Sequence, residues 1–346
     1  MLYTTTRNNT DTFTAHRTLS SGRGPDGGLF VPYRIPVFSR EELDRLAGKG
    51  FNTNLAETLN LFFGCGLTGY DIELALGRRC VRLQQLGQKI IMAQTWHNTD
   101  WCFDRCLQDL CGLVMKDAQQ VTAPTGWAGV AVRTAVLVGI FGELIREGLT
   151  NQDKKTDLCM VSGDFTAPMA CWYARKMGLP IGNIICCCNK NAALWDFMCH
   201  GQLRTDGVAA PTMVPQADVA VPDGLERLIC AFGGPEEAIF FAEKLRRGDT
   251  YYAEDSLLQR MRQGIYVTVS SEKRIRETIP SAFSTHGYLL TPADALCYAG
   301  LQDYRARTGE MPTALIMTEV SPHLHGAVIA EHLGISGDAL QEYLNK

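Results

Sequence analysis

The residues best placed for chemistry form a short loop near the middle of the chain. The loop lies between a predicted apolar strand, 158–161, and a predicted helix, 168–176. A loop between a strand and a helix N-terminus presents free backbone N–H groups and the positive end of the helix dipole, which together favour phosphate binding. A carboxylate in such a loop caps the helix itself and repels a phosphate dianion. The sequence therefore leaves two interpretations open, a ligand-binding loop or an ordinary connection. The residues concerned are Ser162, Gly163, Asp164, Phe165 and Thr166.

The chain also contains thirteen cysteines, which raises the question of metal binding. A metal site would require Cys102 and Cys106, four residues apart on one predicted helix face, to converge with His97 or Cys111. No Cys-x-x-Cys pair is present, and in a long chain without a secretory leader reduced thiols are expected. The run of three cysteines at 186–188 directly follows two isoleucines, as small apolar residues of a buried strand do. We therefore predict core packing for these cysteines and no metal site.

The first 89 residues are predicted to form an N-terminal strand and helical region. Strands are expected over 2–6 and 29–32, separated by a glycine-rich turn. Ser39 with Glu42 forms a capping box that opens a helix, and residues 54–63 repeat apolar side chains along one helix face. A further helix is predicted from Thr68 towards Leu86.

From residue 90 to 346 strands and helices alternate. Strands are predicted over 90–92, 158–161, 184–188, 265–269 and 314–318. Helices are predicted over 100–118, 129–148, 168–176 and 192–199, from Thr291 onward, and in the C-terminal segment, with a looser stretch between 200 and 264. This alternation predicts an α/β fold with a mainly parallel, doubly wound sheet.

Composition narrows the function classes. Hydrophobic residues make up 46% of the 346-residue chain and charged residues 20%, values typical of globular proteins. The formal net charge of −4 offers no cationic excess for nucleic acid or an anionic membrane surface. The N-terminus lacks an apolar leader, and the apolar stretch 130–141 carries Arg133 and is too short to cross a bilayer. We expect a soluble cytoplasmic protein with neither a nucleic-acid partner nor a membrane partner.

Several motifs, in order along the chain, resemble threonine synthase, a pyridoxal-phosphate (PLP) enzyme of the tryptophan-synthase-β fold type. The opening YTTTR and GPDGGLFVP resemble the family's N-terminal signature, and NTNLAETLNLFFG is similar to its first helices. The stretch VSGDFTAPMACWYARKMGLPIGNI resembles the family's PTGNFGDILAGYYAKKMGLPI, and LIMTEVSP resembles the strand that contains STAHP. The resemblance implies a fold like the large domain of that family and PLP as a possible cofactor.

The resemblance also locates a departure at the cofactor lysine. The family carries its Schiff-base lysine in HGPTLAFKD, and the matching stretch here is WHNTDWCFD, with Phe103 in the lysine position and Asp104 behind it. A phenyl ring can neither form an imine nor accept a proton, so no covalent PLP is expected. Lys116 is an alternative amine, but it lies about 20 Å further along the same predicted helix, and a solvated cation is the favoured interpretation.

Two more departures follow from the same comparison. Trp127 resembles the start of a family segment that normally follows a small βα domain, yet it comes only 127 − 104 = 23 positions after Asp104, so the small domain is expected to be largely deleted. In the phosphate loop, Asp164 stands where the family has Asn and Thr166 where it has Gly. Thr318 is retained at the position that faces the pyridine nitrogen in the family.

Three functions remain open on this reasoning. The favoured one is a threonine synthase-like protein that has lost PLP catalysis and acts by binding a small molecule or a protein partner. The second is a divergent enzyme that uses the same cleft on a phosphorylated, amino-acid-like substrate. The third is an active threonine synthase that converts O-phosphohomoserine to threonine. Candidate ligand-binding residues besides the 162–166 loop and Thr318 are His97, Asn98, Thr99 and Asp104, with Cys102 as a further candidate for changed chemistry.

The predicted helix 100–118 raises the possibility of self-association. It carries a series of large apolar side chains that the small domain would cover in the family, and Trp96 precedes it. Either these side chains form a homodimer or partner surface, or the helix packs inward against 129–141. We expect a homodimer.

Overall fold

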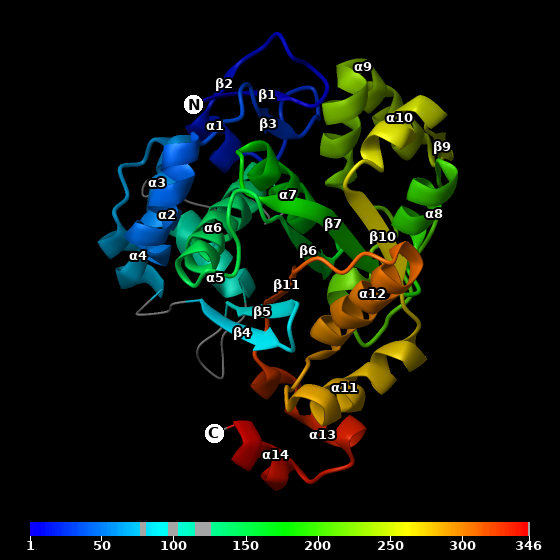
Figure 1. Cartoon of the computed structure of the whole chain (residues 1–346). Coiled ribbons are helices and arrows are strands. Elements are labelled where there is room, and N and C mark those ends of the chain that lie inside the picture. The colour runs from blue at the N-terminus through cyan, green and yellow to red at the C-terminus, as the bar shows by residue number, and fades with distance from the viewer. Residues whose placement is uncertain (77–80, 96–102, 115–125, 345–346) are drawn as a thin grey trace.

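The computed structural model of the chain describes residues 1–76, 81–95, 103–114 and 126–344, with side chains left out of the description at 103–107. At its centre is a six-stranded sheet in the order β10-β7-β6-β11-β5-β4 (Figure 1). Every neighbouring pair is parallel except β4 with β5 at one edge. The strands are β4 (Arg82–Leu86), β5 (Ile90–Gln94), β6 (Thr156–Val161), β7 (Ile181–Cys188), β10 (Ile265–Val269) and β11 (Ala314–Thr318). The predicted α/β class with a mainly parallel sheet is confirmed.

One edge of this sheet differs from the prediction. The helix that begins after Thr68 is α4 (Gly69–Leu76), and it ends ten residues before Leu86. The segment 82–86 is instead strand β4, antiparallel to β5. Most of β4 is exposed or half-buried, as expected at a sheet edge, so its strand identity comes from hydrogen bonds to β5 and not from its own pattern.

Helices cover both faces of the sheet, and the strands alternate side chains between them. On β7, Ile184, Cys186 and Cys188 belong to the core that includes α6 (Trp127–Arg146) and α7 (Thr166–Lys176). Ile185 and Cys187 belong to the core formed with α11 (Glu272–His286) and α12 (Pro292–Thr308). The three-cysteine run therefore fills a buried strand, as predicted, but on both of its faces.

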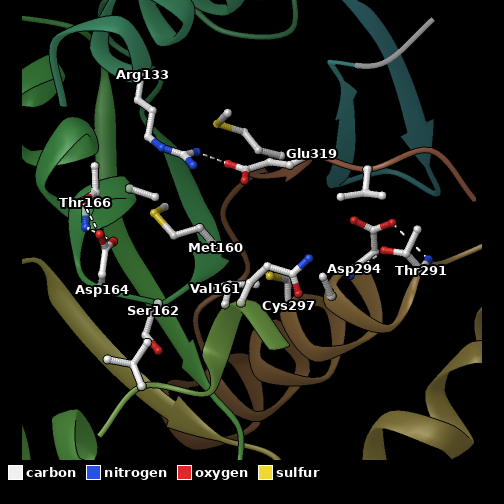
Figure 2. Close-up of a pocket in the computed structure, with 17 residues that line it drawn as sticks. Arg133, Met160, Val161, Ser162, Asp164, Thr166, Thr291, Asp294, Cys297 and Glu319 are labelled. Atoms are coloured by element: carbon white, nitrogen blue, oxygen red, sulfur yellow. Dashed lines mark hydrogen bonds and ion pairs between the residues drawn. The ribbon is translucent and has the colours of Figure 1, made fainter. Parts of the chain in front are cut away.

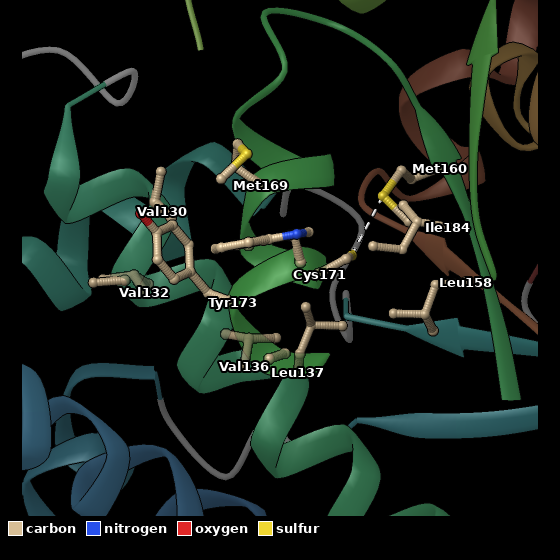
Figure 3. Close-up of a cluster of buried hydrophobic side chains, with 14 of the residues drawn as sticks. Val130, Val132, Val136, Leu137, Leu158, Met160, Met169, Cys171, Tyr173 and Ile184 are labelled. Carbon is tan, nitrogen blue, oxygen red and sulfur yellow. Dashed lines mark hydrogen bonds between the residues drawn. The ribbon is translucent and has the colours of Figure 1, made fainter. Parts of the chain in front are cut away.

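Helix α6 is the central helix of the first face (Figure 3). It is longer than the predicted apolar stretch and is long and apolar enough to cross a membrane by length and composition, which corrects that expectation. Of its most apolar window, 89% is buried inside the protein, so it serves as a core helix. Gly139 and Gly142 allow close packing, since a Cβ at Gly142 would lie 2.4 Å from Asn54 Nδ2.

The N-terminal region packs against α6. A small sheet in the order β2-β1-β3 precedes a group of helices, and the predicted capping box of Ser39 and Glu42 is present. Tyr3 and Phe62 contact the indole of Trp127, with ring centroids 5.5 Å apart in both pairs. The elements are β1 (Leu2–Thr5), β2 (Phe13–Thr14), β3 (Phe30–Pro32), α1 (Ala15–Ser20), α2 (Arg40–Lys49) and α3 (Phe51–Phe63).

The stretch 200–264, for which no elements were predicted, contains a 23-residue helix, α9 (Leu225–Arg247). A kink at Gly234, which has a positive φ of 85°, and Pro235 interrupt its apolar pattern, which is why the sequence conceals it. The remaining elements are α5 (Phe103–Val114), α8 (Ala193–His200), β8 (Gln202–Leu203), β9 (Tyr251–Tyr252), α10 (Asp255–Met261), α13 (Gly326–Leu333) and α14 (Gly337–Leu344), with short 3-10 turns at Pro215–Ala217 and Pro322–His325.

The connection between α5 and α6 consists of residues 115–126 only. Within the described ranges no second α/β domain appears beside the six-stranded sheet. On α5, Leu110 and Cys111 are buried in the same core as α6, while Leu113 and Val114 pack against it more loosely. The described end of this helix therefore packs inward.

Candidate functional site

A cavity of about 270 Å³ lies at the carboxyl ends of β6 and β11 (Figure 2). Ligands commonly bind at this edge of a parallel sheet, where loops follow the strands. Most of the cavity wall is apolar, with a few converging polar groups, as in small-molecule sites. The wall is formed by Arg133, Met160, Val161, Ser162, Gly163, Asp164, Thr166, Ala167, Gln216, Val219, Thr291, Ala293, Asp294, Cys297, Met317, Glu319 and Val320.

The predicted loop forms one side of this cavity. Asp164 Oδ1 accepts a hydrogen bond from the backbone N–H of Thr166 at 2.9 Å, and its Oδ2 accepts from the Thr166 hydroxyl at 2.8 Å. The Asp164 carboxylate thus occupies the N-terminus of α7, which confirms that it caps the helix. The N-cap position itself belongs to Phe165, which is fully buried and adopts a left-handed φ of 72°. Burial of its ring holds this unfavourable backbone conformation in place.

An ion pair forms the second charged group of the cavity. Arg133 reaches from α6 and donates a hydrogen bond to Glu319 Oε1, directly after β11. The Arg133 side chain is mostly buried and that of Glu319 is about one-third exposed. An Arg–carboxylate pair on a cavity wall can exchange either partner for a charged ligand group.

Asp294 supplies an unusual carboxyl group on the third side. It lies in the first turn of α12, where it forms a capping box with Thr291: Asp294 Oδ2 accepts from the Thr291 backbone N–H, and the Thr291 hydroxyl accepts from the Asp294 N–H. Burial raises the pKa of Asp294 to about 7, because the charged form loses its hydration, and the hydrogen bonds from Thr291 only partly oppose this. This carboxyl group therefore changes its charge near neutral pH.

The predicted site residues have different outcomes. The loop 162–166 lines the cavity, apart from the buried Phe165. Thr318 is fully buried between two lining residues, and its carbonyl accepts a hydrogen bond from the Thr95 hydroxyl at 2.9 Å. Phe103 and Asp104 open α5, but their side chains are outside the description. The predictions for His97, Asn98, Thr99, Cys102 and Lys116 fall outside the described residues.

Three charged residues of the cavity wall were not predicted as site residues. Arg133 was noted only as a charge within an apolar helix, and that isolation is a usable signal, because a buried cation needs an acidic partner. Glu319 follows directly after the predicted strand 314–318, where site residues often stand. Asp294 lies in the first turn of the helix predicted from Thr291 onward, and nothing in the sequence reports its burial.

Both the sequence and the fold are similar to those of threonine synthases. A family model described as "Threonine synthase N terminus" matches residues 2–75. Threonine synthase-like 1 of Homo sapiens is 25% identical over 189 residues, which cover 54% of this chain and 25% of that protein. Threonine synthase of Corynebacterium glutamicum is 25% identical over 248 residues, or 68% of this chain and 50% of that protein. Residues 2–75 therefore match the N-terminal region of threonine synthases, and the chain is similar in sequence to threonine synthases and to threonine synthase-like 1 proteins.

Solved structures agree on the fold. The PLP-bound threonine synthase of Brucella melitensis superimposes with a TM-score of 0.83 at 16% identity, covering 100% of this chain and 95% of that one. Yeast threonine synthase gives the same TM-score at 14% identity, covering 99% and 93%. The match spans about a quarter of the length of the threonine synthase-like 1 proteins.

The loop at the N-terminus of α7 does not fit the phosphate of PLP. The Asp164 carboxylate already accepts the first helical N–H and the adjacent hydroxyl, so a phosphate would have to displace it and approach its negative charge. Thr166 also carries a Cβ at a position where the resembling motif has glycine. The observed charges therefore disfavour a phosphorylated cofactor in this cavity.

Proposed function

We propose that this protein binds a small molecule in the cavity at the ends of β6 and β11, without forming a Schiff base with PLP. The observation that carries the proposal is the placement of Asp164, whose carboxylate occupies the position that a phosphate-binding loop would need. An intact wall of hydroxyl, guanidinium and carboxyl groups around about 270 Å³ supports binding as the retained activity.

The charges of the cavity support an amine-bearing ligand. Arg133 is its single cation among the lining residues, and it is paired with Glu319. Asp164 and, above neutral pH, Asp294 add negative charge. A protonated amine is attracted by this surplus, while a phosphate dianion is repelled. The volume lies just below the usual range for ligand pockets, so the ligand has the size of an amino acid or a small amine.

A divergent enzyme is the second candidate, and one observation favours it. A carboxyl group with a pKa of about 7 inside a cavity suits proton transfer at neutral pH. In that case Asp294 would exchange a proton with the bound ligand. The phosphorylated substrate considered from the sequence is less favoured than an unphosphorylated one, for the charge reason given above.

The test uses the purified full chain and calorimetric titration with L-serine and O-phospho-L-serine, a pair that differs only in the phosphate. We expect L-serine or another small unphosphorylated amino acid from a panel to bind. Binding should strengthen as the pH rises through about 7, because Asp294 then ionises. Glu319→Gln should weaken binding. Glu277→Gln, on the exposed side of α11, should leave it unchanged.

Two results would contradict the proposal. One is tighter binding of the phosphorylated partner in such pairs. The other is a pyridoxyl-lysine found by peptide mass mapping after incubation with PLP and borohydride reduction, which would indicate a functioning cofactor lysine, with Lys116 as the first position to inspect. We also propose that the protein is cytoplasmic. The inward packing of Leu110 and Cys111 on α5 opposes the homodimer predicted from the sequence. Sedimentation at high concentration decides between a 38.2 kDa monomer and a dimer.

A further inference from the structure

Three buried cysteines from three different elements meet behind the cavity. Cys159 comes from β6, Cys187 from β7 and Cys297 from α12, and all three side chains are almost completely buried. Their sulfur atoms all lie within 4.8 Å of one another, with Cys159 Sγ and Cys187 Sγ 3.4 Å apart. No other group of three potential metal ligands occurs among the residues that the structure describes.

The separation of the sulfur atoms suits a single metal ion. Zinc–sulfur bonds of about 2.3 Å at tetrahedral angles place two ligand sulfurs about 3.8 Å apart. The observed separations extend from 3.4 Å to no more than 4.8 Å, so they bracket this value. An ion at the centre would require these separations to move toward 3.8 Å, by no more than about 1 Å for the widest pair.

A buried hydroxyl group beside the cluster adds support. Thr268 on β10 is 1% exposed, and the Cys187 sulfur is the acceptor next to its Oγ1, with no nitrogen or oxygen partner among the described residues. It stands beside Cys187, its register partner on β7, and both Thr268 Oγ1 and Cys187 Sγ lie 2.5 Å from the position that a Cβ on Gly300 would take. A buried hydroxyl is costly when unpaired, and a thiolate beside it would accept its hydrogen bond.

The route from the cavity to the three sulfur atoms, and the net charge of the site once an ion is bound, indicate which ion fits. Cys297 also lines the cavity, so an ion can enter from there and a water or ligand can complete its coordination, as in zinc sites with three protein ligands (Figure 2). Three thiolates leave a net charge of −1 around a divalent ion and −2 around a monovalent one. The smaller charge is less costly in a buried site, which favours Zn²⁺ over Cu⁺.

We propose that Cys159, Cys187 and Cys297 form a site for a divalent thiophilic ion, Zn²⁺, at the back of the cavity. Binding exchanges the thiol protons for the ion without any change in oxidation state: Zn²⁺ bonds to three sulfurs, and up to three protons leave to solvent. This inference is independent of the ligand proposed above. It differs from the sequence-based prediction, which assigned Cys187 to core packing and considered a metal site only around Cys102 and Cys106.

The experiment titrates Cd²⁺ alone into the metal-stripped, reduced full chain and follows the ultraviolet thiolate-to-cadmium charge-transfer band. We expect one ion per chain. Cys187→Ala and Cys297→Ala should lower the affinity by about a hundredfold or more, since even the loss of outer-shell partners costs about 10–100-fold. The matched control is Cys186→Ala, the neighbouring buried cysteine on the opposite face of β7, which should bind Cd²⁺ as the unmodified chain does.

Two further measurements test the metal site even if the cysteine variants fail to fold. Thr268→Val keeps the shape of the side chain and should weaken Cd²⁺ binding about tenfold. X-ray absorption of the unmodified chain loaded with Zn²⁺ should show three sulfur neighbours at about 2.3 Å. Absence of stoichiometric Cd²⁺ uptake, an equal loss of affinity in Cys186→Ala, or a zinc shell without sulfur would overturn the proposal.

Discussion

The face of the sheet covered by α6 and α7 and the face covered by α11 and α12 are built on the same strands, yet they differ in chemistry. The first contains mainly aliphatic and aromatic side chains around Trp127. The second contains the capping box of Asp294, the thiol cluster and several tyrosines. Even the run of three cysteines is divided, with Cys187 on the second face and its two neighbours on the first.

This difference separates stability from function within one sheet. Since side chains alternate along a strand, each strand contributes to both faces, and substitutions one residue apart test different roles. The first face contains the larger apolar core. The cavity takes Asp294 and Cys297 from the second face, Arg133 from α6, and Asp164 and Glu319 from the loops after β6 and β11.

The largest loss of stability is expected for a substitution on the face covered by α6 and α7. Trp127 is fully buried among Tyr3, Phe62 and Tyr173. Trp127→Ala should lower the free energy of unfolding by about 3–5 kcal/mol, because it removes a large apolar side chain and leaves a cavity. Urea denaturation measures the loss. Trp127→Phe should cost clearly less, and an equal cost for both would contradict the packing argument.

On the face covered by α11 and α12, the contribution of Asp294 to stability should depend on pH. Asp294 has a pKa of about 7 in the folded chain against 3.8 ordinarily, so between these values the folded chain holds a proton that the unfolded chain has lost. The resulting stabilisation is complete below about pH 4 and is lost as the pH rises to about 7. The asparagine in Asp294→Asn does not titrate, so the variant does not lose this stabilisation as the pH rises. The difference in free energy of unfolding, variant minus original chain, should therefore increase by up to about 4 kcal/mol from pH 4 to pH 8. Parallel pH profiles for the two proteins would disprove this account.

Substitutions of Asp164 in the 162–166 loop should cost less stability than the two changes described above. Asp164→Ala removes the acceptor of the Thr166 N–H and should lower the free energy of unfolding by about 0.5–2 kcal/mol. Asp164→Asn should cost much less, because the amide oxygen still accepts a hydrogen bond. Thermal denaturation distinguishes the two variants. If neither substitution changes stability, Asp164 does not cap α7. New phosphate affinity in Asp164→Asn would identify charge repulsion as the barrier to phosphate binding.

The smallest difference in stability is expected between two matched substitutions on neighbouring residues of β7. Ile184 and Ile185 are both fully buried but face opposite sides of the sheet. Ile184→Val and Ile185→Val should each cost about 0.5–1.5 kcal/mol, with little difference between them, because each removes one buried methylene. Unfolding in guanidinium compares them directly. A much lower cost for Ile185→Val would indicate that the second face is also more loosely packed.

Local patterns were enough for much of the fold. The strands 265–269 and 314–318 begin and end where predicted, and the capping boxes of Ser39 and Thr291 open the expected helices, because short apolar runs and cap residues report local structure directly. Strand β4 and helix α9 were missed. The first owes its structure to pairing with β5, and the second contains a Gly-Pro kink that hides its period.

The sequence by itself determined the α/β class, the resemblance to threonine synthase and the acidic residue in the 162–166 loop, because each depends on residue types in order along the chain. Only the tertiary structure decided that Arg133 meets Glu319 across 186 positions, that Asp294 is buried and that Cys159, Cys187 and Cys297 converge. These depend on which faces of distant elements pack together, and burial then sets the charge and reactivity of the groups. The proposed ligand site joins Asp164 to Arg133, Glu319 and Asp294 of that second set, and the proposed metal site consists of its three cysteines.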